Sequence, residues 1–356
     1  MNRTSERNFL LVADGMTDEN RPFGKPPVFP ECPGLTRLCR EGAYGYFRTC
    51  PVGLPVDSLS GILTLLGVPE ESIRMAGRSW LEAKSAGIPL TNNDLAFRCT
   101  AVLLENDRVV SPCPCWLASW NTEISPGMEL YHLSDYRGII VVRNADETVN
   151  DISSLPPHEH WGEHWKHFFP NGGITANLLK DFMRETRKSD FALVPWGGSD
   201  YGKLPKLETL FGLQGAAVTA AEISRGIALE MGFFAPEIPG ATGETDTDLK
   251  RKTEIALQMS HKYPLVFLHV NGADEASHRR NPQEKAVFLN RLDREMIQPL
   301  AQAGNLLVCS DHGSSPITGK HIGGEQPFAL WDRQHKGALG TINGNESIRL
   351  LTRGNL

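Results

Sequence analysis

The sequence has no long hydrophobic run and no block of basic residues. Its longest apolar stretches, Phe9–Ala13 and Pro264–Val270, are far shorter than the roughly 20 residues that a membrane-spanning helix needs. Residues 1–8 are polar and lack the apolar core of a signal peptide, so we expect a cytoplasmic protein with no membrane partner. Lys and Arg are scattered and the formal net charge is −6, which argues against a nucleic-acid partner.

Several common cofactor motifs are also missing. The seven cysteines show no C-x-x-C spacing, so we expect reduced thiols rather than a structural zinc site. No G-x-G-x-x-G follows the first apolar segment, and the glycine-containing segment 240–245 lacks the lysine of a P-loop. His160, Glu163 and His164 match the H-x-x-E-H pattern of some zinc peptidases, but Gly162 argues against the helix that this motif requires.

Apolar segments of strand length alternate with amphipathic segments of helix length towards both ends of the chain. This alternation predicts an α/β fold in which helices cover both faces of a mostly parallel sheet. The expected strands are Phe9–Ala13, Asp190–Trp196, Pro264–Val270 and Asn305–Ser310, and the expected helices are Pro33–Glu41, Ser58–Leu66, Ala220–Met231, Thr247–Ser260 and Pro282–Ala303.

The middle of the chain has a different pattern. Between residues 90 and 188, short strand-like segments such as Phe97–Leu104 and Gly138–Arg143 alternate with many turn residues. We interpret residues 90–188 as an inserted α+β cap domain that binds substrate. Residues 1–89 and 189–356 would then form one discontinuous, metal-binding core.

Three of four short motifs with carboxylate or imidazole groups directly follow predicted strands, and the fourth, His321, stands in a loop-like segment shortly after the third. In open parallel sheets, ligands bind at the carboxyl ends of the strands. Three carboxylates and three imidazoles suit two divalent ions of the zinc, manganese or iron type, and two ions about 4 Å apart can hold both oxygens of an in-line phosphoryl displacement. The six residues are Asp14, Asp274, His278, Asp311, His312 and His321.

A serine is the candidate nucleophile. Ser58 begins a predicted helix, where free backbone N–H groups favour an incoming phosphate. A hydroxyl bound to a metal ion loses its proton more readily, which makes a serine a competent nucleophile. Each motif alone is weak evidence, but their shared placement at strand ends favours phosphoryl transfer.

The chain resembles the archaeal-type branch of the cofactor-independent phosphoglycerate mutases, within the alkaline-phosphatase superfamily. The resemblance covers most of the sequence. It rests on the segments VADGMTD, VDSLSGILTLLGV, AGRSWLEAKSAGIPL, DLAFRC, PPHEH, PWGGSDYGKLPKLETLFGL, HVNGADEASH and SDHGSSPITGKHIGGEQPF. It implies an alkaline-phosphatase-like fold with an inserted cap.

The resemblance also implies two metal sites. One ion would be held by Asp14, Ser58, Asp311 and His312, and the other by Asp274, His278 and His321. Mn²⁺ is the ion we expect, and the same ligands accept Zn²⁺, Co²⁺ or Mg²⁺.

The implied reaction is the interconversion of 2- and 3-phosphoglycerate, a small phosphorylated metabolite, through a phosphoserine. Ser58 would take the phosphoryl group and return it to the other hydroxyl of the retained product. Arg78 and Arg98 match motif arginines that would bind phosphate or carboxylate, because a guanidinium fork suits both oxyanions. His158, in the PPH segment, would face the substrate.

The sequence departs from the family near the nucleophile and in the substrate motifs. Leu59 and Ile62 stand where the family has polar residues near the nucleophile. Ser79 replaces the second glycine of the family's G-R-G stretch, and Thr100 replaces the usual Asn. These departures leave three alternatives open. They are a phosphatase or phosphonate hydrolase of the same superfamily, a homoserine-type phosphotransferase, and a metal-binding protein without catalytic activity.

Overall fold

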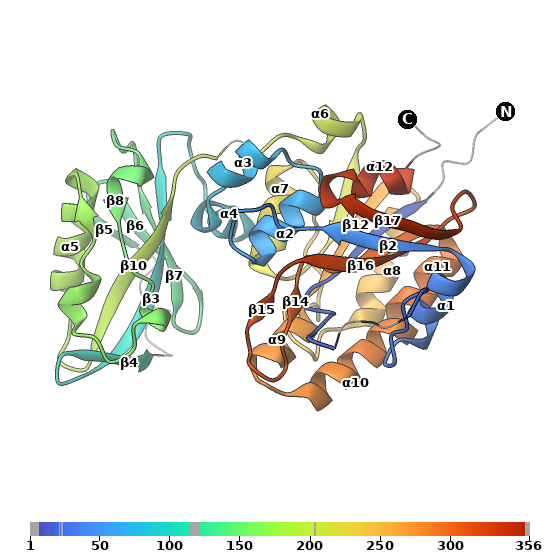
Figure 1. The fold of residues 1–356 in the computed structure, drawn as a ribbon. Coiled ribbons are helices and arrows are strands. Elements are labelled where there is room, and N and C mark those ends of the chain that lie inside the picture. The colour runs from blue at the N-terminus through green and yellow to red at the C-terminus, as the bar shows by residue number, and fades with distance from the viewer. Residues whose placement is uncertain (1–6, 21, 23, 114–121, 203, 353–356) are drawn as a thin grey trace. The chain divides into compact units, whose positions relative to one another are not determined.

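The computed structural model describes residues 7–20, 22, 24–113, 122–202 and 204–352 (Figure 1). Its contacts divide the chain into two compact units. The core unit comprises Met1–Arg74 and Leu204–Leu356, and the inserted unit comprises Met75–Lys203. The limits at residues 90 and 188 that we expect for a cap domain stay a prediction.

The core unit is built on a sheet of seven strands in the order β11-β12-β1-β13-β16-β2-β17. β1 lies inside the sheet and pairs in parallel with β12 and β13, whereas β16 runs antiparallel to both of its neighbours. The mostly parallel α/β sheet predicted from the sequence is therefore confirmed. The strands are β1 (Asn8–Ala13), β2 (Ala43–Arg48), β11 (Gly215–Val218), β12 (Leu265–Val270), β13 (Asn305–Cys309), β16 (Glu325–Trp331) and β17 (Gly337–Asn343).

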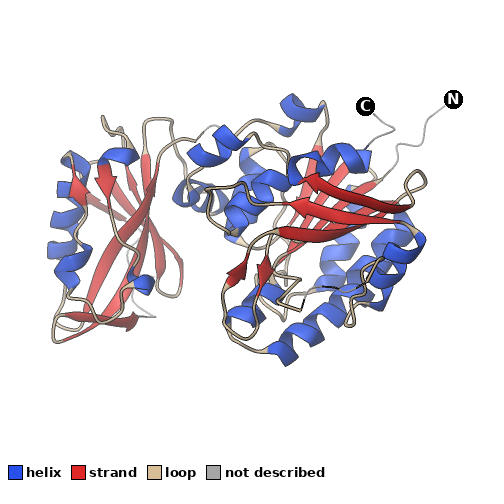
Figure 2. Cartoon of the chain, in the orientation of Figure 1, coloured by secondary structure: helices blue, strands red, loops and turns tan. Residues whose placement is uncertain are grey.

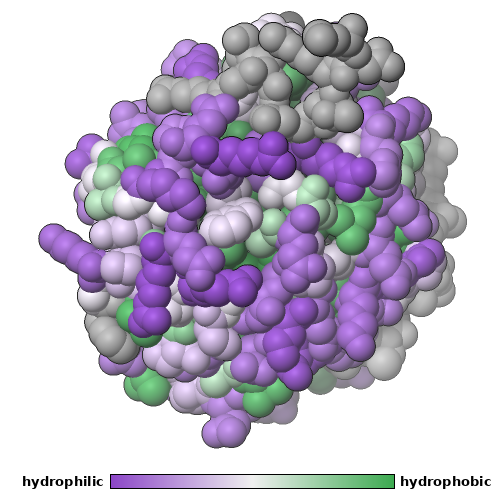
Figure 3. Space-filling model, turned by 90° about the vertical axis from the view of Figure 1, so that its right-hand side faces the viewer, coloured by the Kyte–Doolittle hydropathy of each residue, from purple (hydrophilic) through white to green (hydrophobic). Residues whose placement is uncertain are grey.

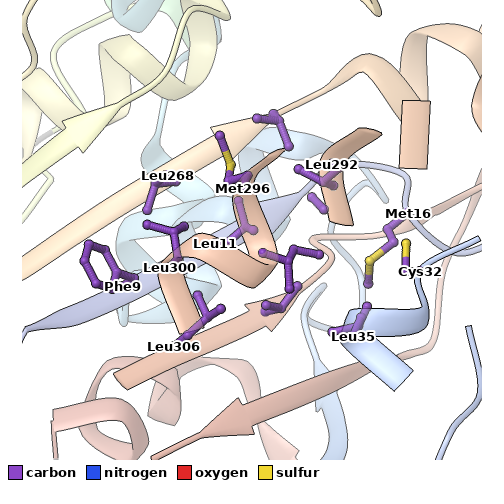
Figure 4. Packing of buried hydrophobic residues seen from close by; sticks show 14 of the residues in the cluster. Phe9, Leu11, Met16, Cys32, Leu35, Leu268, Leu292, Met296, Leu300 and Leu306 are labelled. Atoms are coloured by element: carbon purple, nitrogen blue, oxygen red, sulfur yellow. The ribbon is translucent and has the colours of Figure 1, made fainter. Parts of the chain in front are cut away.

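Helices cover both faces of this sheet (Figure 2). Phe9 and Leu11 point to the same face of β1, because side chains alternate along a strand, and they pack in one cluster with Leu292, Met296 and Leu300 (Figure 4). One face carries α1 (Pro33–Glu41), α8 (Leu249–Met259), α10 (Pro282–Leu292) and α11 (Gln298–Ala303). The other carries α2 (Ser58–Leu65), α7 (Glu222–Glu230) and α12 (Ser347–Thr352). The shorter helices are α3 (Glu70–Met75), α6 (Leu207–Phe211) and α9 (Gly272–His278).

The helix expected at Pro282–Ala303 is interrupted, which corrects that prediction. A single π-helical turn, Asp293–Ile297, separates α10 from α11. Pro299 has no backbone N–H, so it cannot donate to the carbonyl of Glu295 as a continuous α-helix requires. That carbonyl accepts a hydrogen bond from the Thr253 hydroxyl at 2.9 Å instead.

The inserted unit contains a separate antiparallel sheet in the order β10-β3-β7-β6-β5, with β4 paired to β3. α5 (Ile174–Thr186) and α4 (Arg78–Ser85) pack against it through two different hydrophobic clusters. The strands are β3 (Leu95–Glu105), β4 (Arg108–Pro112), β5 (Thr122–Ser125), β6 (Met128–Ser134), β7 (Arg137–Val142) and β10 (Phe191–Ser199). The strand expected at Asp190–Trp196 therefore pairs in this sheet and not in the parallel one, because β10 runs antiparallel to β3.

The helices and the surface drawn in Figure 3 agree with the lack of long hydrophobic runs in the sequence. In the part of the chain that the structure describes, no helix combines the length and the apolar character needed to span a membrane. The face drawn in Figure 3 is covered mainly by hydrophilic side chains, and its hydrophobic residues form small separate patches.

Candidate metal centre

The first candidate ligand stands where the inner strand β1 ends. Asp14 is 3% exposed, and its backbone N–H donates to the carbonyl of Val270, the last residue of β12, at 2.9 Å. Gly15 follows with a φ of 63°, and a Cβ atom there would lie 2.8 Å from the Cα atom of Asp274. A residue without a side chain is therefore needed where the chain passes α9, and this close passage brings Asp14 and Asp274 together.

Asp274, His278 and His321 form the first cluster of candidate ligands. Asp274 and His278 lie one turn apart on α9, with His278 Nε2 3.0 Å from Asp274 Oδ2. His321, on the short strand β15 (His321–Ile322), has its Nε2 atom 3.6 Å from Asp274 Oδ1. The Nδ1 atoms of His278 and His321 face the carbonyl oxygens of Gly319 and Val56 at 3.0 and 2.8 Å. Protons on these Nδ1 atoms leave both Nε2 lone pairs directed at the cluster.

A second cluster contains Asp14, Ser58, Asp311 and His312. His312 Nε2 lies 3.5 Å from Asp14 Oδ1 and 3.6 Å from Asp311 Oδ2. The Ser58 hydroxyl donates to Asp14 Oδ2 at 3.0 Å and lies 3.3 Å from His312 Nε2. β13 ends at Cys309, before these ligands, so the consecutive residues Asp311 and His312 can both face one site.

Helix α2 brings Ser58 to this cluster. Asp57 caps the helix by accepting a hydrogen bond from the backbone N–H of Ser60 at 2.9 Å, which fixes Ser58 as the first helical residue. A Cβ atom on Gly61 would lie 2.7 Å from the Cβ atom of Asp311. The absence of a side chain at Gly61 therefore lets α2 approach the end of β13.

Burial strongly perturbs the charges of the second cluster. Burial, together with neighbouring carboxylates, raises the pKa of Asp14 and of Asp311 to about 7. Burial opposes the charge of His312, but the carboxylates of Asp311, Asp14 and Asp274 outweigh it and raise the pKa of this imidazole to about 9. Without a cation, the carboxyl groups of Asp14 and Asp311 are therefore partly protonated at neutral pH.

The first cluster is held by a closer ion pair. The hydrogen bond that His278 donates to the Asp274 carboxylate raises the pKa of this imidazole to about 9. Burial alone would raise the pKa of Asp274, but the hydrogen bond and charge of His278, with the charge of His312, hold it well below its usual range. Burial, and then the charge of His312, lowers the pKa of His321.

The unsatisfied atoms of the second cluster fit a metal ion. Among the residues that the structure describes, Asp14 Oδ1 and both carboxylate oxygens of Asp311 are buried without a hydrogen-bond partner. Such atoms are costly to bury unless something binds them. The separations of 3.0 to 3.6 Å between candidate donors match two ligands that each lie about 2.1 Å from one ion. The buried Asp and His residues of this cluster therefore have the composition and spacing of a metal site.

Sequence reasoning missed three polar residues around these clusters. His269, on β12, is 1% exposed, and its Nε2 atom lies 3.3 Å from Asp14 Oδ2; burial lowers its pKa to about 4. The Ser314 hydroxyl donates to Asp274 Oδ1. Lys285 donates through Nζ to the carbonyls of Thr17 and Ser314 at 3.1 and 2.7 Å. A lone histidine in an apolar strand gives no sequence signal that separates it from an ordinary core residue.

The three expected substrate residues line one pocket of about 310 Å³ in the inserted unit. Arg78 and Arg98 donate through Nε to the two carboxylate oxygens of the buried Glu82, at 2.8 and 2.9 Å. The Cζ atom of Arg98 lies 4.4 Å above the ring of Trp196, and the His158 ring lies 5.1 Å from the same ring. Glu82 thus fixes both guanidinium groups in a pocket with an aromatic wall.

The pocket is strongly cationic. Arg137 also lines it, and sequence reasoning did not single out this residue. Burial lowers the pKa of Arg98, although Glu82 opposes the shift, and burial lowers the pKa of His158. A pocket with three guanidinium groups and one buried carboxylate is suited to an anionic ligand.

The H-x-x-E-H segment does not form the helix of a zinc peptidase, which confirms that expectation. Gly162 has a φ of 91°, which interrupts any regular helix between His160 and His164. His160 follows a 3-10 turn, Pro157–Glu159, and His164 precedes another, Trp165–Phe168. Within the described ranges, no group of three candidate metal ligands includes these histidines.

Comparisons with known proteins agree with this geometry. The model of the Metalloenzyme superfamily matches residues 6–356. A 2,3-bisphosphoglycerate-independent phosphoglycerate mutase of Methanothrix thermoacetophila is 26% identical, covering 97% of this chain and 99% of that protein. A probable enzyme of the same name from Geobacter sulfurreducens is 28% identical, covering 95% of this chain and 93% of that protein.

Solved structures share the fold. A protein of Pyrococcus horikoshii superposes with a TM-score of 0.71 at 21% identity and covers 98% of this chain and 97% of its own. A cofactor-independent phosphoglycerate mutase from Thermoplasma acidophilum gives a TM-score of 0.64 at 16% identity, with 98% and 99% covered. The family model matches nearly the whole chain, and candidate ligands cluster at the strand ends. This protein therefore belongs to the Metalloenzyme superfamily.

Proposed function

We propose that this chain catalyses metal-dependent phosphoryl transfer through a phosphoserine on Ser58. The activity would be that of a 2,3-bisphosphoglycerate-independent phosphoglycerate mutase, or of a close phosphomutase. One observation carries the proposal: the Ser58 hydroxyl lies 3.0 Å from Asp14 and 3.3 Å from His312, among buried candidate ligands. The names of full-length relatives support the same reaction.

Two divalent ions fit the two clusters. Mn²⁺ is the ion we expect, with Zn²⁺, Co²⁺ and Mg²⁺ as alternatives. When bound, the ions supply positive charge that stabilises phosphoryl oxygens and favours the deprotonated serine. The proposed ligands are Asp14, Ser58, Asp311 and His312 for one ion, and Asp274, His278 and His321 for the other.

The chain's own residues account for the two half-reactions. Ser58 Oγ attacks phosphorus, and its proton has an acceptor in Asp14 Oδ2. The bond between phosphorus and the substrate oxygen breaks, and that oxygen keeps the electron pair and takes the proton that Ser58 gave up. In the second half-reaction, the other hydroxyl of the retained product attacks phosphoserine, the bond between phosphorus and Ser58 Oγ breaks, and the proton of that hydroxyl passes to Ser58 Oγ.

The pocket of the inserted unit would hold the anionic part of a small phosphorylated metabolite. Arg78 and Arg98 would bind a carboxylate or phosphate, with Glu82 fixing the orientation of both guanidinium groups. His158 would contact the same ligand from beside Trp196. We further propose that residues 90–188 act as the substrate domain.

A phosphohydrolase of the same superfamily is the second candidate. Ile62 lies on α2 one turn after Ser58 and is fully buried. Because its side chain is apolar, it cannot hydrogen-bond a product hydroxyl near the nucleophile. A mutase must retain its dephosphorylated intermediate and exclude water, whereas a hydrolase admits water.

The test is incubation of Mn²⁺-loaded protein with 3-phosphoglycerate, with 2-phosphoglycerate detected through enolase and inorganic phosphate measured in parallel. We expect 2-phosphoglycerate, and Ser58→Ala should reduce its formation by at least about 10³-fold. Ser60→Ala, a buried hydroxyl of the same helix, is the matched control. Phosphate release alone would favour the hydrolase, and neither product from fully metallated protein would contradict the mutase.

A further inference from the structure

A buried histidine beside the second cluster has no role in the reaction described above. His269 lies on β12 in register with Val12 of β1, two residues before Asp14, which directly follows that strand. The imidazole is 1% exposed. Among the residues that the structure describes, neither ring nitrogen has a hydrogen-bond partner. Burying such a group unsatisfied costs about 1–3 kcal/mol, which calls for a compensating interaction.

The carboxylate of Asp14 lies beside this ring. His269 Nε2 lies 3.3 Å from Asp14 Oδ2, and one ligand atom each from Asp14, His269 and Asp311 fall within 4.8 Å of one another. At this separation, an N–H group at Nε2 is within hydrogen-bonding distance of Oδ2. That bond would leave Asp14 Oδ1, which has no described partner, facing His312 Nε2 at 3.5 Å.

We propose that His269 is a positioning residue for the metal centre: it holds Asp14 through Oδ2 so that Oδ1 is presented to the cation. This inference rests on the proposed function, because it assumes a cation between Asp14, Asp311 and His312. Carboxylate ligands need such outer partners to keep their orientation, and losing one typically weakens metal binding about 10- to 100-fold. Among the described candidate ligands, His269 groups with Asp14 and Asp311, both proposed ligands of the same ion, so we expect the binding of that ion to be affected.

The test compares His269→Gln, which retains an N–H donor of similar reach, with His269→Leu, which has none. Phe267→Leu is the packing control, because Phe267 is fully buried on the same face of β12, two residues earlier. Mn²⁺ titrations followed by the electron paramagnetic resonance of free Mn²⁺ give the affinity of each site. The melting temperature of metal-free protein reports packing separately.

We expect two Mn²⁺ ions on the unaltered protein and one of them bound about 10- to 100-fold more weakly in His269→Leu. His269→Gln should stay within the same order of magnitude as the unaltered protein, and Phe267→Leu should lower the melting temperature without changing either affinity. Unchanged affinity in His269→Leu would overturn the positioning role. Equal losses in the Gln and Leu variants would also overturn it, because they indicate direct ligation by the imidazole. No Mn²⁺ on the unaltered protein would instead refute the proposed metal centre itself.

Discussion

The Nε2 atoms of His278 and His321 lie 3.2 Å apart, each within 3.6 Å of an oxygen of Asp274. Both Nδ1 atoms face backbone carbonyls, so both Nε2 atoms can point at a cation. When no cation is bound, the raised pKa of His278 keeps a proton on its Nε2 atom beside Asp274, and a cation held by both Nε2 atoms would replace that proton. The two imidazoles and Asp274 therefore fit a site that is completed by a metal ion.

Metal binding should therefore stabilise the protein. We expect Mn²⁺ at 100 times its Kd to add about 2.7 kcal/mol per site to the free energy of unfolding, and a chelator to remove it. Melting curves with and without the ion measure this effect. His321→Ala should abolish the stabilisation from one of two ions, and a melting temperature that ignores Mn²⁺, Zn²⁺ and Co²⁺ alike would contradict the prediction.

Gly15→Ala should weaken Mn²⁺ binding at the proposed metal centre in addition to straining the backbone. Gly15 and Gly87 have similar φ values, 63° and 70°. A Cβ atom on Gly15 would lie 2.8 Å from the Cα atom of Asp274. Around a Cβ atom on Gly87, none of the described atoms would lie within 4 Å. Both substitutions should cost about 1 kcal/mol through φ. Gly15→Ala should cost about 1–3 kcal/mol more and weaken Mn²⁺ binding, because the chain must move away from Asp274. Urea denaturation and metal titration of both variants measure the difference, and equal effects would show that the contact with Asp274 is unimportant.

Glu82→Gln should destabilise the inserted unit and weaken anion binding. The Glu82 side chain is 4% exposed and pairs with both Arg78 and Arg98, so its loss leaves guanidinium charge uncompensated. We expect a loss of about 3 kcal/mol in urea denaturation and a higher KM for the phosphorylated substrate.

The control for Glu82 is an exposed ion pair with the same i, i+4 spacing as the pair of Glu82 with Arg78. Glu70→Gln breaks the pair with Arg74, whose side chains are 52% and 44% exposed, and should cost less than about 1 kcal/mol. Similar losses for the two variants would mean that burial of Glu82 has no energetic consequence.

Lys252 predicts a pH dependence of stability in the alkaline range. It is fully buried on α8, and burial lowers its pKa from 10.5 to about 8. Between these values the unfolded chain binds more protons than the folded one, so this lysine makes the free energy of unfolding rise with pH. Lys252→Met should therefore be more stable than the unaltered protein by about 3 kcal/mol at pH 7, with the difference vanishing near pH 10.5. Lys250→Met, on the exposed face of the same helix, should show no such trend, and a pH-independent difference for Lys252→Met would refute the assignment.

The sequence was sufficient to predict the sheet class and the candidate ligands that lie at the strand ends. Asp14, Asp311 and His312 were visible because each follows a short apolar run that predicts a buried strand. The structure adds that Gly15 and Gly61 make the close approaches that bring these segments together. Those approaches depend on partners more than 200 residues away, so no local pattern reveals them.

Other features could not be predicted because their causes are contacts between distant segments. The imidazole of His269 becomes a candidate positioning residue only because Asp14, which follows the neighbouring strand β1, lies beside it. Asp293 accepts hydrogen bonds from the backbone N–H groups of Gly34 and Leu35 at 2.9 and 2.8 Å, at the start of α1. β10 has the apolar pattern of a buried strand, and that pattern does not tell which of two sheets it joins.

The pairing of β1 has a consequence for synthesis on the ribosome. Its two neighbours, β12 and β13, are encoded more than 250 residues later, so the first strand leaves the exit tunnel long before either partner exists. Until then its apolar residues, Phe9–Ala13, and its unpaired backbone groups are open to other chains. We therefore expect this N-terminal segment to be an early site of aggregation during expression.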